Sequence, residues 1–457
     1  MKTIHKILVP NRGEIAIRIF RACHEMGIRT VAVYSKEDVL SLHRSRADEA
    51  YLVGKGKKPV DAYLDIEDII RICKEHDVDA IDPGYGFLSE NAQLAKRCEE
   101  EGIIFIGPKV EHLQMFGDKV NARIQAEKAE IPMIPGTNGA VKDFAEVKAF
   151  AERVGLPVMI KAINGGGGRG MRRVDRMEDL QGAYDEARSE AKRAFGDEDV
   201  YIEKCILNPK HIEVQIMGDE HGNVIHLNER DCSIQRRHQK MAPAWSLPKK
   251  LRQNICAAAL KIMKNVHYVN AGTVEFLADQ DEEHFYFIEV NPRVQVEHTV
   301  TEAITDVDIV KTQILVAEGY ALSDPEIGIK SQADIPCNGV AIQCRITTED
   351  PQNNFMPDTG KINDYRSGGG PGIRLNGQVN YVLEGNLNYT GAVITPYYDS
   401  LLVKVTAHAN NAKETISRML RCLDEFRIGG VKTNIYFLKN MLLDKNFQKG
   451  TCNVNYI

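Results

Sequence analysis

The segment from Thr273 to His298, TVEFLADQDEEHFYFIEVNPRVQVEH, carries the residues whose types and spacing best suit chemistry. Two strand-like runs flank the polar turn DQDEE, a pattern typical of a β-hairpin. If the turn centres on Glu282, Glu275 lies directly opposite Glu289. Carboxylates about 5 Å apart on facing positions would destabilise the sheet unless a cation lies between them. We therefore expect the pair to hold Mg²⁺, with nucleotide phosphates completing its oxygen ligands.

The second run continues with a polar residue at every other position. These residues, which alternate with valines and a proline, are Glu289, Asn291, Arg293, Gln295 and Glu297. With a period of two, all five side chains would point to the same face of a strand. Such alternation usually marks only the solvated face of an antiparallel sheet. An arginine between carboxylates, opposite Glu275, favours instead a site that holds a metal and an anion together.

A second candidate site is the run PVMIKA, which contains Lys161 and precedes the glycine-rich sequence NGGGGRGM. Glycines let the backbone approach phosphate oxygens closely, and a nearby lysine adds positive charge. This is not a Walker A loop, in which the lysine follows the glycines and precedes Ser or Thr. The pattern suits a nucleotide, and the loop is a candidate mobile lid. The alternative is a flexible hairpin tip.

Three further motifs lie between these two candidates. They are YIEKCI with Glu203 and Lys204, KHIEVQ with His211, and NERDCSIQRRHQK with Gln235, Arg236, Arg237, His238 and Lys240. The second motif alone would be read as a plain strand, and the basic cluster as a solvated face or a nucleic-acid patch. A small anionic substrate fits a net acidic chain better. A zinc site of His211, His226 and His238 is disfavoured because their spacing matches no familiar site.

Composition narrows the class of protein. The chain has 457 residues and a net charge of −6, so it has no overall electrostatic reason to bind nucleic acid or an anionic membrane. No apolar run approaches the roughly 18 residues that span a bilayer, and no secretory signal precedes the first strand-like run, so we expect a cytoplasmic protein. Ten cysteines without a CxxC pair indicate reduced, mostly buried thiols.

The elements that must position these residues begin with a βαβ pattern. Strand-like runs at 4–9 and 29–35 alternate with helical runs at about 12–26 and 66–75, which predicts a parallel sheet. Asn11 is the expected N-cap of the first helix, with Glu14 three residues on and Gly27 after its end. The turn VPNRGEIA has one glycine where a dinucleotide fingerprint needs three, so NAD binding is disfavoured.

Two further segments complete the expected organisation. One spans about 117–334 and contains both candidate sites. The other begins near 335, with strand-like runs at 339–346 and 400–408 and helices at about 412–425 and 433–442. The length likewise suggests about three domains. We expect a mixture of α/β and α+β structure.

Taken together, several motifs resemble the biotin carboxylase family of the ATP-grasp fold. They are GDKVNAR, VMIKAINGGGGRGM, YIEKCILNPKHIEVQ, RRHQK, GTVEFL and FIEVNPRVQVEHTVTE. The resemblance extends from NRGEIAIRI to GGVKTNIYFL, nearly the whole chain. NPRVQVEHT, CRITTEDP, FMPDTG and PYYDSLLVK are more similar to the biotin carboxylase domain of pyruvate carboxylases than to that of bacterial acetyl-CoA carboxylase.

The resemblance implies a fold and a reaction. The fold would comprise a Rossmann-like N-terminal domain (1–116), an ATP-grasp domain (117–334) with a mobile lid at about 133–204, and a C-terminal biotin carboxylase domain (335–457). The reaction would be the ATP- and bicarbonate-dependent carboxylation of biotin via carboxyphosphate, the first half-reaction of a biotin-dependent carboxylase. The alternatives are the biotin carboxylase subunit of an acyl-CoA carboxylase, another ATP-grasp ligase, and a non-catalytic nucleotide-sensing module.

The implied partners are a biotin carboxyl carrier domain or subunit, a carboxyltransferase domain or subunit, and a second copy of the chain in a dimer. No AMKM-like lysine motif is present, so we expect the biotin to be carried on another domain or subunit. Neither a nucleic acid nor a membrane is an expected partner.

The resemblance also implies roles for individual residues. ATP would be bound by Lys119, Lys161, Gly165, Gly166, Gly167, Gly168, Glu203, Lys204, His211, Gln235 and His238. Mg²⁺ or Mn²⁺ would be held by Glu275, Glu289 and Asn291, and bicarbonate by Lys240, Arg293, Gln295 and Val296. Glu297 would be the general base that deprotonates bicarbonate, and Arg345 with Arg293 would stabilise the enolate-like oxygen of biotin.

The sequence departs from the family pattern at two places. Lys240 runs directly into MAP, where the family usually has about three more residues, one of them acidic. Either this anion-side loop is shortened or residues are missing between Lys240 and Met241, and we favour the second. The segment RLNGQVNYVLEGNLNYTG is longer than the family's usual connection.

Overall fold

The N-terminal unit is a five-stranded parallel sheet in the order β3-β2-β1-β4-β5. Its strands are β1 (Lys6–Val9), β2 (Arg29–Tyr34), β3 (Glu49–Leu52), β4 (Ala80–Ile81) and β5 (Ile104–Phe105). The accompanying helices are α1 (Gly13–Glu25), α2 (Pro59–Tyr63), α3 (Ile66–Glu75) and α4 (Ala92–Glu101). The computed structural model describes residues 2–137, 139–163, 171–236, 239–241, 247–279, 283–377 and 391–456. The predicted parallel α/β unit is confirmed.

The predicted cap of α1 is wrong. The N-cap residue is Arg12, and it makes no side-chain capping bond. Asn11 instead donates its amide to the carbonyls of Pro83 (2.7 Å) and Tyr85 (2.8 Å), because it faces the end of β4 across the sheet. The carboxylate of Glu14 is likewise taken away from the helix end by an ion pair with Lys404. Local capping chemistry thus gives way to tertiary contacts.

The central unit is built on an antiparallel sheet in the order β10-β9-β13-β14. The strands are β9 (Lys210–Gly218), β10 (Val224–Asp231), β13 (Asn270–Ala278) and β14 (Phe285–Asn291). Helices α5 (Val110–Gly117), α6 (Lys119–Lys128) and α9 (Lys249–Asn265) pack on it, and side chains such as Ile216, Ile255 and Phe276 form the core between them. The opposite face is left to polar residues, which is where the candidate site lies.

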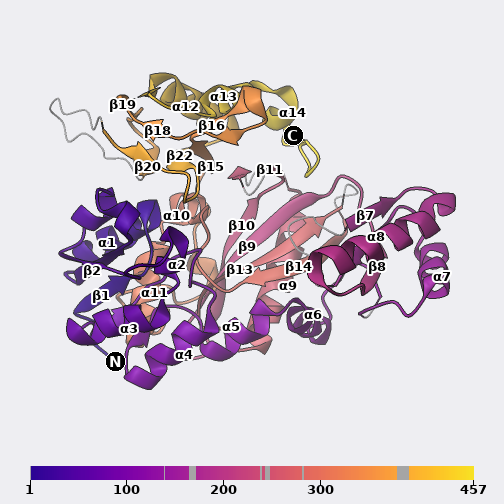
Figure 1. Ribbon diagram of the computed structural model, residues 1–457, viewed down its shortest axis with the longest axis horizontal. Coiled ribbons are helices and arrows are strands. Elements are labelled where there is room, and N and C mark those ends of the chain that lie inside the picture. The colour runs from indigo at the N-terminus through magenta and orange to yellow at the C-terminus, as the bar shows by residue number, and fades with distance from the viewer. Residues whose placement is uncertain are drawn as a thin grey trace.

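A smaller sheet extends from the central unit at the right of Figure 1. Its order is β7-β6-β8, formed by β6 (Val158–Ala162), β7 (Met171–Val174) and β8 (Val200–Lys204). Helices α7 (Phe144–Val154) and α8 (Leu180–Phe195) cover one face, and Val147 of α7 lies in the same buried core as Ile160 and Ile202 of the strands. We call these strands and helices the lid sheet.

The C-terminal unit lies above the other two in Figure 1. Its main sheet has the order β15-β22-β20, from β15 (Val340–Thr347), β20 (Ile373–Gly377) and β22 (Leu401–Ala409). Short strand pairs are β16 (Glu349–Asp350) with β17 (Met356–Pro357), β18 (Gly360–Lys361) with β21 (Val393–Ile394), and β19 (Asp364–Arg366) with β23 (Arg427–Gly429). Helices α12 (Ala412–Glu425), α13 (Ile435–Leu443) and α14 (Lys445–Lys449) cover it.

Two helices connect the central sheet to the flanking units. After β14 the chain turns through residues 292–297 and enters α10 (His298–Thr305) and then α11 (Ile309–Glu318). Helix α10 packs on β10, β15 and β22, whereas α11 packs on α1 and β13. Residues 292–297 therefore lie where the three units meet. Among the described residues, no helix combines the length and apolar character needed to cross a membrane.

Candidate functional site

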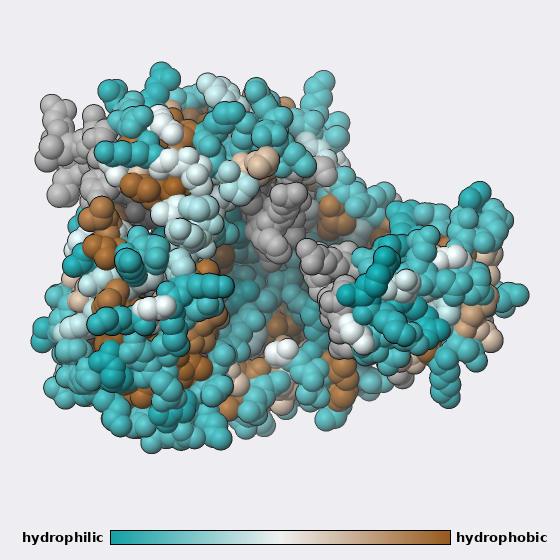
Figure 2. Space-filling model, viewed as in Figure 1, coloured by the Kyte–Doolittle hydropathy of each residue, from teal (hydrophilic) through white to brown (hydrophobic). Residues whose placement is uncertain are grey.

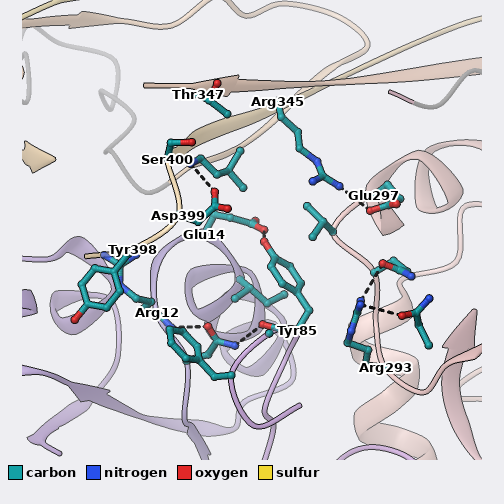
Figure 3. A pocket seen from close by; sticks show the side chains of 18 of the residues that line it. Arg12, Glu14, Tyr85, Arg293, Glu297, Arg345, Thr347, Tyr398, Asp399 and Ser400 are labelled. Atoms are coloured by element: carbon teal, nitrogen blue, oxygen red, sulfur yellow. Dashed lines mark hydrogen bonds and ion pairs between the residues drawn. The ribbon is translucent and has the colours of Figure 1, made fainter. Parts of the chain in front are cut away.

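A cavity of about 710 Å³ opens where the three units meet. Its central-unit wall consists of His211, Glu275, Glu289, Asn291, Arg293, Gln295, Val296 and Glu297. The other walls include Arg12, Glu14 and Tyr85 from the N-terminal unit and Arg345, Glu349 and Tyr398 from the C-terminal unit. Figure 3 shows Arg345 and Glu297 on one side and Glu14 and Tyr85 on another. Figure 2 shows a hydrophilic hollow between the body of the molecule and the lid sheet.

The predicted hairpin pairing is confirmed where it matters. Glu275 on β13 lies opposite Glu289 on β14, as the position of the turn predicted. The register slips by one residue immediately afterwards, so that Phe276 pairs with Phe287. A β-bulge therefore separates the carboxylate pair from the turn. Bulges of this kind re-aim side chains, and this one leaves both carboxylates on the cavity wall.

Hydrogen-bond donors and the ammonium of Lys119 surround this carboxylate pair. Nε2 of His211 donates to Glu275 Oε2 (2.6 Å), and the amide of Asn291 donates to Glu275 Oε1 (2.6 Å). The ammonium of Lys119 lies 3.7 Å from Glu289 Oε2. Two facing carboxylates and an amide oxygen are the hard oxygen ligands that Mg²⁺ prefers. The residues present therefore fit a divalent cation, and Lys119 adds a positive group beside it.

The prediction that one strand carries all five alternating polar residues is wrong. Strand β14 ends at Asn291, and residues 292–297 form an irregular turn. Pro292, which lacks an N–H, cannot extend the hydrogen-bonded ladder. The turn nevertheless brings Arg293, Gln295 and Glu297 to the same cavity. The alternation thus identified the right residues through the wrong backbone geometry.

Ion pairs and hydrogen bonds hold this turn. Arg293 pairs with Glu90 (Nε–Oε1, 2.6 Å) and donates to the side chains of Gln295 (2.9 Å) and Asn291 (3.2 Å). Glu297 is fully buried, and the guanidinium of Arg345 lies 2.9 Å from its Oε2. Figure 3 shows this last pair at the edge of the cavity. A buried carboxylate beside fixed cations is a suitable group for proton transfer near an anion.

Sequence reasoning missed two members, Glu213 and Arg230, of a row of charges across the central sheet. The register places Glu289, Glu275, Glu213 and Arg230 side by side on the four strands. Arg230 pairs with Glu213 (Nε–Oε1, 2.5 Å) and donates to Gln215 and Thr301. Glu213 stands two residues after His211 in KHIEVQ, so the period-two spacing was the signal that could have identified it.

The carboxylate oxygens of Glu213 and Glu297 and the Sγ of Cys232 lie within 4.8 Å of one another, close enough to share a metal ion. Two arginines already supply the positive charge there, because Arg230 pairs with Glu213 and Arg345 with Glu297. Burial alone would lower the pKa of Arg230, but the charges of Glu213 and Glu297 outweigh it and raise that pKa. The cations that neutralise this cluster are therefore guanidinium groups.

The proposed nucleotide residues on the lid sheet do not line this cavity. Lys161 on β6 forms an ion pair with Glu203 on β8. The ammonium of Lys204 donates to the backbone carbonyls of Gly155 (3.0 Å) and Leu156 (3.0 Å). The structure thus brings Lys161 and Glu203 together and turns Lys204 toward the backbone.

Several proposed residues are placed only in part. Gly165, Gly166, Gly167, Gly168 and His238 lie outside the described residues, as does most of the long connection after Asn376. The backbones of Gln235 in β11 (Ile234–Arg236) and Lys240 in β12 (Gln239–Met241) lie directly opposite each other. Strand β12 includes both Lys240 and Met241, and the explanation of the short run after Lys240 stays a prediction.

A network between the N- and C-terminal units closes the far side of the cavity. The guanidinium of Arg12 stacks on the ring of Tyr398 (3.9 Å to its centroid) and makes two hydrogen bonds to Asp38 (2.7 and 2.9 Å). Tyr63 also donates to Asp38 (2.6 Å). Burial favours the neutral form of Asp38, but Arg12 outweighs it and lowers the pKa of the carboxyl to about 2. Sequence reasoning assigned no role to any of these residues, although NRGEIAIRI contains Arg12 and PYYDSLLVK contains Tyr398.

Comparison with family models divides the chain into three matches. Residues 3–113 match the biotin carboxylase N-terminal domain, 118–325 the carbamoyl-phosphate synthase L chain ATP binding domain, and 343–457 the biotin carboxylase C-terminal domain. Pyruvate carboxylase of Bacillus subtilis (strain 168) is 61% identical over the whole chain, and mitochondrial pyruvate carboxylase of Homo sapiens is 53% identical over the same extent. The chain spans 39% and 38% of these two relatives.

Solved structures are also similar. A biotin carboxylase domain dimer of Hydrogenobacter thermophilus 2-oxoglutarate carboxylase, in complex with MgADP, ADP and bicarbonate, is 45% identical with a TM-score of 0.89. The match covers 100% of this chain and 97% of that domain. The biotin carboxylase subunit of a pyruvate carboxylase is 46% identical with a TM-score of 0.85, matched over 99% of this chain and 97% of that one.

Proposed function

Because this chain belongs to the biotin carboxylase family, we propose that it uses ATP and bicarbonate to carboxylate biotin on a carrier domain. The observation that carries the proposal is the row of carboxylates on the central sheet that leads to Glu297 and its arginines. The proposed metal ligands, the turn proposed to bind the anion and the proposed base Glu297 line one cavity. Bicarbonate activation requires these three together.

The metal belongs at the facing carboxylates. Glu275, Glu289 and Asn291 are the proposed ligands, and Mg²⁺ (or Mn²⁺) would neutralise phosphate charge there when bound. Lys119, which already lies beside Glu289, would contact the phosphates. Lys161, Glu203, Lys204, His211, Gln235 and His238, with Gly165–Gly168, are the proposed contacts for the rest of ATP. These roles rest on matching positions in the family motifs.

The turn at residues 292–297 is the proposed bicarbonate site. Arg293, Gln295 and the backbone of Val296, with Lys240, would bind the anion, and Glu297 would remove its proton. Arg293 supplies positive charge that lowers the pKa of bicarbonate, so a carboxylate can act as its base. Attack of the bicarbonate oxygen on the γ-phosphorus would release ADP and form carboxyphosphate. Carboxyphosphate would then release CO₂ for the biotin ureido nitrogen.

Arg345, which pairs with Glu297, has a proposed role toward biotin in the same cavity. Its guanidinium lies 2.9 Å from Glu297 and lines the cavity. A fixed cation there can stabilise the enolate-like oxygen that develops on the ureido group as its nitrogen loses a proton. Phosphate released from carboxyphosphate would take that proton. Arg293 would thus act first on bicarbonate and then, together with Arg345, on the enolate-like oxygen of biotin.

The identity of the whole protein is a further part of the proposal. The chain spans well under half of the pyruvate carboxylases that it resembles. We propose pyruvate as the final acceptor, a carboxyltransferase and a biotin carrier as partner domains or subunits, and a dimer of this domain. We also propose a cytoplasmic location. An acyl-CoA acceptor is the alternative, and carboxylation assays with the complete protein and each acceptor distinguish them.

Phosphate release tests the proposed reaction. The purified chain should release phosphate from MgATP only when bicarbonate is present, and free biotin should raise the rate. A rate of ATP cleavage that depends on neither bicarbonate nor biotin would favour another ATP-grasp ligase. ATP binding without phosphate release would favour a nucleotide-sensing module.

A further inference from the structure

A buried ion pair joins the N- and C-terminal units behind the cavity. Lys404 on β22 is fully buried, and its ammonium lies 2.7 Å from Oε1 of Glu14 on α1. Tyr85 donates its hydroxyl to the same carboxylate oxygen, a contact visible in Figure 3. Burial and the charge of Glu14 raise the pKa of Tyr85 well above its usual value, so this hydroxyl keeps its proton.

The same lysine reaches the turn at residues 292–297, the proposed bicarbonate site. Its ammonium donates to the backbone carbonyl of Val296 (2.9 Å). Gln343 on β15 donates to this carbonyl as well (3.3 Å) and to the hydroxyl of Thr299 (2.7 Å). Val296 stands between Gln295 and Glu297, which both line the cavity. Two side chains of the C-terminal unit therefore hold the backbone of the turn that carries these residues.

Stability alone does not account for a charged pair in this place. Removing an ammonium and a carboxylate from water is costly, and apolar side chains of similar volume are often as stable or more so. Desolvation lowers the pKa of Lys404, and the charge of Glu14 opposes that shift. What an apolar pair could not provide is a hydrogen bond to the Val296 carbonyl. The presence of this buried ion pair is therefore better explained by its hydrogen bond to the backbone of Val296 than by its contribution to stability.

We propose that Lys404 and Glu14 are positioning residues, which fix the Val296 carbonyl and thereby hold Gln295 and Glu297 in place for bicarbonate. Lys404 supplies the hydrogen bond, and Glu14, held by Tyr85, fixes the lysine. The inference rests on the proposed function for its kinetic consequence only. Its structural consequence, an ordered turn at residues 292–297, is independent of the reaction.

The first test measures kinetics of Lys404→Met. Loss of the hydrogen bond should raise the KM for bicarbonate by about fivefold or more, because a misplacement of the turn weakens anion binding. The KM for ATP should change less than twofold. The matched control is Arg252→Met, which breaks a pair with the equally buried Glu229 (2.6 Å) away from the cavity. A bicarbonate KM that is unchanged, or that rises as much in the control, would overturn the proposal.

The second test is hydrogen exchange, which needs no activity. The amides of His298 and Val300 donate to the carbonyls of Gln295 and Glu297, so loosening the turn should speed their exchange. We expect faster exchange in peptides covering 294–300 for Lys404→Met and not for Arg252→Met. Equal exchange in both variants would contradict the proposal.

The two tests separate the inference from the proposed function. A wild-type chain without bicarbonate-dependent ATP cleavage would refute the function, and the exchange result would still decide the inference. If Lys404→Met does not fold, the double variant Glu14→Gln/Lys404→Met leaves no unpaired buried charge and carries the same measurements. For that variant the expected and contradicting results are the same.

Discussion

The turn at residues 292–297 and the lid sheet hold their charged side chains in different ways. Glu297 is fully buried and Gln295 nearly so, and partners from all three units surround the turn. On the lid sheet, Lys161 keeps a quarter of its side chain exposed and pairs with Glu203 on the neighbouring strand. Contacts between the three units therefore fix the side chains of the turn, whereas contacts within one small sheet fix Lys161.

This difference indicates that the turn is already arranged for its ligand, whereas the lid sheet is not. Groups fixed by buried partners need little rearrangement when a ligand binds, so they can stabilise developing charge efficiently. Lys161, in contrast, must exchange its contact with Glu203 for a phosphate oxygen if it binds ATP. We therefore expect changes in the turn to affect bicarbonate binding and turnover, and changes in the lid sheet to affect ATP affinity.

The largest effect should come from Glu297→Gln. The amide keeps the shape of the carboxylate but cannot accept the bicarbonate proton, so bicarbonate-dependent ATP cleavage should fall by about 10³-fold. Steady-state phosphate release measures the rate, and binding of an ATP analogue serves as the folding control. A loss below tenfold with normal analogue binding would show that Glu297 is not the base.

Glu289→Gln should reduce turnover by about 10²-fold, because it removes one hard anionic oxygen from the proposed Mg²⁺ site. Its effect should shrink as Mg²⁺ is raised, which a titration of turnover against Mg²⁺ measures. Glu283→Gln, an exposed change on the same hairpin, is the matched control. Wild-type turnover of Glu289→Gln at ordinary Mg²⁺ would refute the ligand assignment.

Acid should lower the stability that Asp38 contributes through its contacts with Arg12 and Tyr63. The folded pKa of Asp38 is about 2, below the unfolded value of about 3.9. Its stabilising contribution of about 2.5 kcal/mol is therefore present above pH 4 and lost as the pH falls toward 2. Urea unfolding between pH 5 and pH 2 should show this loss in the wild type and a smaller one in Asp38→Asn. Identical pH dependence in the two proteins would contradict it.

The smallest effect should come from the lid sheet. Lys161→Met should raise the KM for ATP by about tenfold through loss of one phosphate contact, with the bicarbonate KM within twofold. Lys148→Met, an exposed change on α7, is the control. A larger effect on bicarbonate than on ATP would remove the distinction between the two regions.

Local periodicity predicted much of the fold and part of the site. The strand runs, the helices near 66–75 and 412–425 and the Glu275–Glu289 register depend on nearby residues, and the structure has them. The N-cap at Asn11 and the straight strand through Glu297 were wrong because tertiary contacts and Pro292 override local pattern.

The residues that sequence reasoning missed depend on contacts between distant segments. Lys404 and Glu14 are 390 positions apart in the chain and meet only when the N- and C-terminal units pack together. Arg230 reaches Glu213 through the sheet register, and Arg12 reaches Asp38 and Tyr398 through the packing of two units. No spacing rule within one segment could have joined these pairs.

Transfer of labelled bicarbonate to free biotin tests the central claim most directly. The chain is incubated with MgATP, ¹⁴C-bicarbonate and biotin, and acid-labile label on biotin is measured after removal of CO₂. We predict label on biotin that requires both ATP and Mg²⁺ and is lost in Glu297→Gln. ATP cleavage without label on biotin, or equal labelling by Glu297→Gln, would contradict the account.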